Sequence, residues 1–208
     1  MSHVIRELLE AIVLALLAFF IIQISVQNFR VEGHSMQPTL DGGEYLMVNK
    51  LAYFKVDMAR LARLVPFWSV DEHSNKFIPF AHPPERNDVI VFHSPTSEGK
   101  DFIKRVVGLP GDKVEIRAGH VYINGIPYNE PHLARIDLSQ SMDCVPRTER
   151  FGCRLAEDQY FVMGDNRGSS NDSRDWGPVQ LDAMVGKVWF IYWPFSKLPW
   201  VGSLSDSQ

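Results

Sequence analysis

Ser35 and Lys104 are the two residues whose types and surroundings could together do chemistry. Ser35 lies between Gly33 and Pro38, two residues that favour a turn. A serine hydroxyl becomes a useful nucleophile near neutral pH only when a base removes its proton. His34 is the adjacent residue and would point elsewhere in an extended chain, so the base must come from another segment.

Lysine serves as such a base when burial keeps part of its amine neutral. Lys104 lies in the run DFIKRVV, in which alternate residues of a strand would share a face. Lys104 would then project with Phe102 and Val106, and these apolar neighbours favour a lowered pKa of the amine, whereas Arg105 points the other way. The same pattern is typical of a surface lysine whose stem lies along apolar residues, and a segment such as SMQPTL is also typical of an ordinary turn.

Short β-rich runs separated by turn residues must position these two side chains. The runs are EYLMV (44–48), DVIVF (88–92), FIKRVV (102–107), KVEI (113–116), HVYI (120–123), QYFVM (159–163) and KVWFIYW (187–193). Asn124-Gly125 is a strong hairpin signal, because a type I′ turn needs positive φ at both central residues. The sequence therefore predicts a mainly β catalytic domain, an antiparallel barrel or sandwich.

The first residues of the chain predict one N-terminal transmembrane helix. Residues 11–22 contain no polar side chain, and the apolar stretch from 8 to 26 approaches the roughly 20 residues that a membrane-spanning helix needs. We therefore expect a membrane anchor in residues 1–28 and a β-rich domain in residues 29–208. A cleaved signal peptide and a buried core helix are alternatives, but no A-x-A cleavage pattern follows the apolar run.

The sequence gives less direct evidence for the side of the membrane on which the β-rich domain lies. Arg6 precedes the anchor and several basic residues follow it, so the positive-inside rule does not favour a cytoplasmic N-terminus. Cys144 and Cys153 bracket a short loop that a disulfide could close, and such a bond persists only in an oxidising compartment. The pair therefore favours an extracytoplasmic domain, with two unrelated free thiols as the alternative.

Composition excludes several other classes of function. The chain has 208 residues and a formal net charge of −4, which argues against nucleic acid as the partner. Two cysteines cannot build a four-thiolate zinc site, and the seven histidines show no metal-ligand spacing. No phosphate-binding glycine motif is present, and in the acidic run 165–172 Arg167 stands where a calcium ligand would be needed. We expect neither a metal nor a cofactor.

Three segments give weaker predictions of structure or function. Residues 50–84 are irregular, with an amphipathic helical turn expected at 58–68 and a linker at 82–88. Neither residues 50–84 nor residues 129–157 receive a functional role. The Trp- and Tyr-rich run at 187–193 is either a buried final strand or a segment near the lipid headgroups.

Four blocks of the sequence, in this order after the apolar segment, resemble the type I signal peptidases, which are membrane-anchored serine endopeptidases. The blocks are GHSMQPTL (33–40), RNDVIVF (86–92), DFIKRVVGLPGDKVEI (101–116) and GDNRGSSNDSRDWGPV (164–179). The third and fourth blocks are highly specific, whereas SMxPTL also occurs in related self-cleaving repressors. The resemblance extends over nearly the whole chain.

The resemblance implies a catalytic dyad of serine and lysine. Ser35 would attack the scissile carbonyl, and Lys104 would accept the proton of its hydroxyl and later return one to the leaving amine. Ser170 matches the family serine that hydrogen-bonds to the lysine and orients it, and Asp172 and Arg174 match a charged pair that supports this corner.

The resemblance also bears on substrate binding. Many relatives carry a serine two residues before the nucleophile that helps to hold the oxyanion, but this chain has Gly33, so the backbone amide of Ser35 would be the main donor. Family members cleave after small residues at the first and third positions before the bond. The residues that the resemblance assigns to these pockets are Phe29, Met36, Leu40, Leu46, Val91 and Ile103.

We therefore expect a single-pass enzyme of the plasma (inner) membrane whose catalytic domain lies on the extracytoplasmic, or periplasmic, side. It would cleave signal peptides from exported preproteins, with the bilayer and the secretion machinery as further partners. Ser35 is nine residues beyond Val26, so an extended connector would keep it within roughly 30 Å of the membrane. The alternatives are a related maturation peptidase of a conjugation or secretion system, a self-cleaving repressor, and a catalytically inactive anchored β scaffold.

Overall fold

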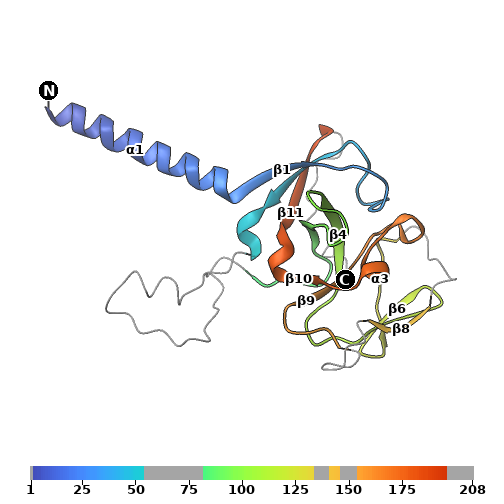
Figure 1. The fold of residues 1–208 in the computed structure, drawn as a ribbon. Coiled ribbons are helices and arrows are strands. Elements are labelled where there is room, and N and C mark those ends of the chain that lie inside the picture. Colours follow the sequence, from blue (N-terminus) through green and yellow to red (C-terminus); the bar gives the residue numbers. More distant parts are fainter. Residues whose placement is uncertain (1, 54–81, 134–140, 146–153, 196–208) are drawn as a thin grey trace, which may run out of the picture.

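The computed structural model describes residues 2–53, 82–133, 141–145 and 154–195 (Figure 1). The first element is the helix α1, Ser2–Ser25, which extends away from the β domain. Residues His3–Ser25 are long and apolar enough to cross a membrane, and none of their apolar core is buried against the protein. The alternative of a buried core helix therefore has no support in this structure.

The β domain begins at Val26, three residues before the predicted boundary, because β1 (Val26–Arg30) follows α1 directly. The alternation in VQNFR is weak, since only two of its five side chains are half-buried, and for that reason the run escaped prediction. Residues 26–28, the last of the predicted anchor region, therefore form the first part of β1.

A seven-stranded antiparallel sheet forms most of the domain, in the order β1-β2-β11-β3-β4-β9-β10. Its further strands are β2 (Tyr45–Asn49), β3 (Val89–His93), β4 (Asp101–Gly108), β9 (Gln159–Met163), β10 (Val179–Gln180) and β11 (Met184–Trp193). Short helices connect them: η1 (Lys50–Tyr53), η2 (Arg167–Ser169), α3 (Ser173–Trp176) and η3 (Leu181–Ala183). The predicted mainly β, antiparallel fold is confirmed.

A small second sheet has the order β7-β6-β5-β8, and Figure 1 shows its β6 and β8 at the end of the domain away from α1. Its strands are β5 (Val114–Arg117), β6 (His120–Ile123), β7 (Ile126–Pro127) and β8 (Met142–Val145). Asn124 and Gly125 join β6 to β7 with φ values of 53° and 84°, so the hairpin predicted from this dipeptide is present.

All seven predicted strands are present; six lie within one residue of their expected bounds, and β11 begins three residues before the predicted run at 187–193. Among the described residues, the strands that were not predicted are β1, β8 and β10, which are short or polar. The expected helical turn at 58–68 and the pairing of Cys144 with Cys153 concern parts of the chain outside the described residues and side chains.

An apolar core lies between the nucleophile loop (residues 31–44) and the large sheet. Its buried residues are Val31, Met36, Leu40, Leu46, Val48, Val89, Val91, Val188 and Ile191. In β11 the buried Val188 and Ile191 face this core, whereas Trp189 and Trp193 are about half exposed. The run at 187–193 is thus a core strand that also carries two exposed aromatic residues.

Candidate active site

Ser35 and Lys104 lie side by side although 69 residues separate them in the sequence. Lys104 lies in the middle of β4, opposite Ile90 of β3, and Ser35 lies in the turn that follows β1. The Lys104 Nζ donates hydrogen bonds to Ser35 Oγ, at 2.9 Å, and to the carbonyl oxygen of Ile103, also at 2.9 Å. Proton transfer between the two side chains requires hydrogen-bond reach, and this distance provides it.

The Lys104 side chain is shielded from water, with 4% of the residue exposed. Burial lowers the pKa of its ammonium group from 10.5 to about 8, against the opposing effect of the Asp172 and Asp165 carboxylates. The Phe102 ring, whose centroid lies 5.5 Å from Nζ, forms part of the apolar surroundings. At pH 7 about a tenth of such amines are neutral, compared with fewer than about one in a thousand at a pKa of 10.5.

Asn166 fixes the nucleophile loop from the other side. Its backbone amide donates to the carbonyl oxygen of Ser35 at 3.0 Å, and its side-chain Nδ2 donates to that of His34 at 3.1 Å. Gly164 allows this close approach: a Cβ at this position would lie 2.5 Å from the Ser35 carbonyl oxygen, and closer still to Ser170 Oγ. The GDN run of the fourth sequence block therefore holds the Ser35 backbone.

A buried ion pair lies on the face of β4 opposite Lys104. Arg105, next to Lys104 but on the opposite face of β4, donates to both carboxylate oxygens of Asp165, at 2.9 and 2.7 Å. The Thr39 hydroxyl donates to the same carboxylate, so the nucleophile loop, β4 and the loop after β9 meet at one group. Both Arg105 and Asp165 side chains are 1% exposed, and removal of either partner would leave an uncompensated buried charge.

His132 lies beside this ion pair and Glu130 lies against the neighbouring Arg167, although the segment 129–157 received no role from the sequence. Glu130 pairs with Arg167, and His132 Nε2 lies 3.6 Å from Asp165 Oδ1. Burial, together with the positive charge of Arg105, lowers the pKa of His132 to about 4, so its ring is neutral at pH 7. These residues belong to no recognisable sequence motif, so the sequence did not indicate their position.

Asp172 and Arg174 form the charged pair that the resemblance implies. Arg174 donates to the two carboxylate oxygens of Asp172 at 2.7 and 2.8 Å, and the Asp172 carboxylate also accepts the backbone N–H of Gly164 at 2.9 Å. Arg174 further donates to the Ser170 carbonyl oxygen at 3.3 Å. The pair thus braces the GDN run that contacts the nucleophile loop.

The hydrogen bond from Ser170 to Lys104 does not form in this structure, contrary to what the resemblance implies. Ser170 Oγ is buried and has no hydrogen-bond partner among the described residues. The Ser170 hydroxyl occupies the space that a side chain at position 164 would fill. Lys104 instead directs its N–H groups to Ser35 and to the carbonyl of its own neighbour, Ile103.

A cleft of about 520 Å³ opens beside the dyad, lined by residues 29–36, 100–104, Ser169 and Asn171. Of the six expected pocket residues, Phe29, Met36 and Ile103 line this cleft. Leu40, Leu46 and Val91 belong to the same apolar cluster but are fully buried behind it. Val31 and Phe102 also line the cleft and were not among the expected pocket residues.

Two unpaired strand edges border the cleft. In the described part of the chain β1 pairs only with β2, and residues 101–104 of β4 pair only with β3 because β9 begins its pairing at Arg105. Four antiparallel steps separate β1 from β4, so the two edges run in the same direction. An extended peptide placed between them could hydrogen-bond to both strands.

Comparison with known proteins identifies the family. The family described as "Signal peptidase, peptidase S26" matches residues 5–193. The chain belongs to this family. Signal peptidase I of Bacillus caldolyticus is 37% identical over 175 residues, which are 82% of this chain and 81% of that protein. The chain is accordingly a serine endopeptidase of the signal peptidase I type.

A second relative agrees with this membership. Signal peptidase IB of Staphylococcus aureus is 32% identical in an alignment of 205 positions that covers 92% of this chain and 93% of that protein. A solved structure of a signal peptidase I from Enterococcus faecalis is 35% identical, and its match covers 51% of this chain and 97% of that one with a TM-score of 0.45.

Proposed function

We propose that this signal peptidase cleaves N-terminal signal peptides from exported preproteins with a Ser35–Lys104 dyad while α1 anchors it in a membrane. The single observation that carries the dyad is the 2.9 Å hydrogen bond between a nearly fully buried amine and the Ser35 hydroxyl. Family membership supports the substrate class, because the relatives reported above are named signal peptidases.

The first chemical step would start from neutral Lys104. Its Nζ accepts the Ser35 hydroxyl proton as Ser35 Oγ attacks the scissile carbonyl carbon, and the resulting ammonium then donates that proton to the leaving amine nitrogen. An acyl-enzyme on Ser35 remains, and the neutral amine then removes a proton from the water that hydrolyses it. A base with a pKa near the working pH is the most effective, and the value of about 8 fits this role.

The oxyanion would be held mainly by the backbone N–H of Ser35. Gly33 adopts a φ of +84°, in the region that L-residues rarely adopt, so this position shapes the loop rather than supplying a hydroxyl. Loss of one oxyanion donor typically costs about 3 kcal/mol of transition-state stabilisation. The hydrogen bonds from Asn166 to the Ser35 and His34 carbonyls would keep the amide in place.

The preference for small residues would follow from how the cleft is closed. The substrate lies as an extended strand between β1 and β4, and its alternate side chains point down toward Met36 and Ile103. Behind these residues the fully buried Leu40, Leu46 and Val91 leave no room for deeper side chains. One additional methylene in such a pocket costs about 1–3 kcal/mol, whereas a charged side chain also loses its hydration.

We place the β domain on the extracytoplasmic face of the plasma membrane, beside the secretion machinery that delivers the preproteins. The strand β1 leads directly from the end of α1 to the nucleophile loop, which keeps the dyad near the bilayer surface. The exposed Trp189, Trp193 and Phe195 have the chemistry that favours the headgroup layer.

The proposal is tested by preprotein cleavage with the full-length protein in detergent. We expect the wild type to release signal peptides from several unrelated preproteins, and Ser35→Ala and Lys104→Ala to be inactive. Lys113→Ala is the matched control, because this partly exposed lysine pairs with Glu115 near the small sheet and should be dispensable. Full activity of either dyad variant would exclude the dyad, and cleavage of a single dedicated substrate would favour a maturation peptidase instead.

A further inference from the structure

A second hollow, separate from the cleft beside the dyad, lies where α1 meets the β domain. Its volume is about 760 Å³, and its apolar wall comes from α1, η1, η3 and the start of β11. The residues of this wall are Ile24, Leu51, Leu181, Met184 and Val185. We refer to this hollow as the basal groove. Because Ile24 belongs to the last turn of the apolar helix, the groove opens at the level where the chain would leave a membrane.

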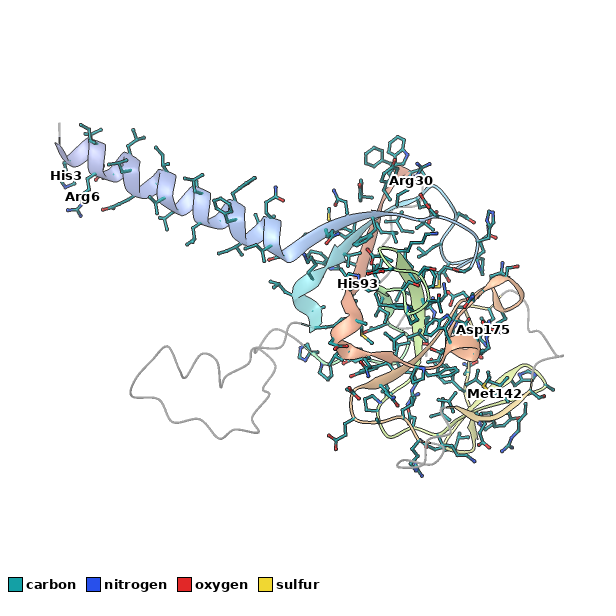
Figure 2. All side chains as sticks on the ribbon, viewed as in Figure 1. His3, Arg6, Arg30, His93, Met142 and Asp175 are labelled. Atoms are coloured by element: carbon teal, nitrogen blue, oxygen red, sulfur yellow. The ribbon has the colours of Figure 1, made fainter. Side chains whose placement is uncertain are left out.

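The basal groove and the substrate cleft have one lining residue in common, Asp101. Asp101 is the first residue of β4 and lines both hollows. Its carboxylate contacts the ring of His93 on the neighbouring strand at 2.7 Å, and His93 also lines the groove. Figure 2 shows His93 on the side of the domain near the base of α1, whereas Met142 of the small sheet lies toward its far end.

The direction of the strands determines which part of a substrate would reach the groove. β1 runs from the end of α1 toward Ser35, and β4 runs in parallel from Asp101 toward Lys104. A substrate tethered in the same membrane by its apolar segment would run the same way, so the residues before the scissile bond pass Asp101. Three strand residues span roughly 10 Å between Asp101 and Lys104. The groove therefore begins at about the fourth residue before the bond.

We propose that the basal groove binds the end of the apolar segment of the signal peptide, about four to eight residues before the scissile bond. The inference rests on the proposed function and adds a binding site upstream of the small-residue pockets. The groove is mainly apolar, as is this part of the substrate, and it shares the lining residue Asp101 with the cleft that receives the bond. The enzyme would thus measure the distance from the membrane-embedded segment to the bond.

Two peptides that differ only in length test the site. The short peptide begins at the third residue before the bond, and the long one adds six upstream residues, five of them apolar. Burial of one large apolar side chain is enough for about a tenfold gain, so we expect kcat/KM of the wild type to be about tenfold higher for the long peptide. In Leu51→Glu the ratio should fall to near one, because Leu51 is 37% exposed and tolerates the change sterically.

Ile126→Glu is the matched control, since Ile126 is 69% exposed and lies in β7 of the small sheet, and this variant should keep the wild-type ratio. The ratio compares two substrates of the same enzyme preparation, so a reduced folded fraction does not change it. A wild-type ratio of one, or an unchanged ratio in Leu51→Glu, would overturn the groove assignment. Failure to hydrolyse either peptide would instead overturn the proposed function.

Photocrosslinking gives a second measurement. A benzoylphenylalanine residue at position 51 in the inactive Ser35→Ala protein should capture the long peptide at residues four to eight before the bond. The same residue at position 126 should capture none. Capture of phospholipid without peptide at position 51, in bilayers that contain both, would mean that lipid occupies the groove and would refute the inference.

Discussion

Replacement of Lys104 by methionine should abolish activity and, near neutral pH, increase stability. Methionine has a similar length and no charge, so it fills the site without the cost of desolvating an ammonium group. The difference between a pKa of 10.5 in the unfolded chain and about 8 in the folded one corresponds to about 3 kcal/mol. The variant also loses the hydrogen bonds of Nζ to Ser35 and Ile103, worth about 1 kcal/mol each. We therefore expect Lys104→Met to be about 1 kcal/mol more stable at pH 7.

The sign of this difference should reverse with pH. Between about pH 8 and pH 10.5 the unfolded wild type holds the lysine proton and the folded wild type does not, so the stability of the wild type rises relative to the variant. Above pH 10.5 the amine is neutral in both the folded and the unfolded wild type, so only the loss of the two hydrogen bonds still affects the variant. It should then be about 2 kcal/mol less stable than the wild type.

Urea unfolding of both proteins in detergent at pH 7 and pH 11 measures this change, and kcat/KM measures the activity. Removal of a general base costs about 10²–10⁴-fold in rate. Lys50→Met is the matched control, because it makes the same replacement at an exposed position. The same stability difference for Lys104→Met at pH 7 and pH 11 would refute the reasoning that burial neutralises the amine.

Two further substitutions test how the nucleophile loop is held. In Gly164→Ala the new Cβ would displace Ser170 and the Ser35 carbonyl, so we expect the stability to fall by about 1–3 kcal/mol and kcat to fall roughly a hundredfold. Urea unfolding and peptide hydrolysis measure these two effects, and a wild-type kcat would contradict the role of this contact. Asp172→Ala leaves the Arg174 charge buried without its partner and should lower the stability by about 3–5 kcal/mol. The double variant Asp172→Ala/Arg174→Met should recover part of this loss in urea unfolding, and an equal loss of stability in both variants would argue against the ion pair as the cause.

The sequence was sufficient for the strands that carry the chemistry. The alternation around Lys104 correctly indicated an inner face, because Lys104 and Val106 are buried, and Arg105 on the opposite face is buried too, in its ion pair with Asp165. β1 was missed because its polar side chains are tolerated at the edge of the sheet, where one face is solvated. The alternation alone did not select the dyad, because both faces of β4 are buried at these positions; the pairing of Ser35 with Lys104 was implied by the family resemblance.

Long-range polar contacts were beyond the reach of the sequence. Nothing in the segment around Glu130 and His132 indicates that it packs on Asp165 and Arg167, because these contacts depend on how the two sheets meet. The position of Ser170 also depends on a side-chain rotamer rather than on spacing, and its hydroxyl lies unpaired beside Gly164 rather than on the lysine. The basal groove likewise appears only when α1, η1 and β11 are brought together.

The titration of the Lys104 amine tests the account most directly. NMR of the full-length protein in detergent, with labelled lysine and the Lys104→Met variant to assign the signal, gives the pKa of this one group. We predict a pKa of about 8. A value near 10.5, as for a lysine in water, would mean that the amine stays charged at the pH of the reaction and would contradict its role as the base.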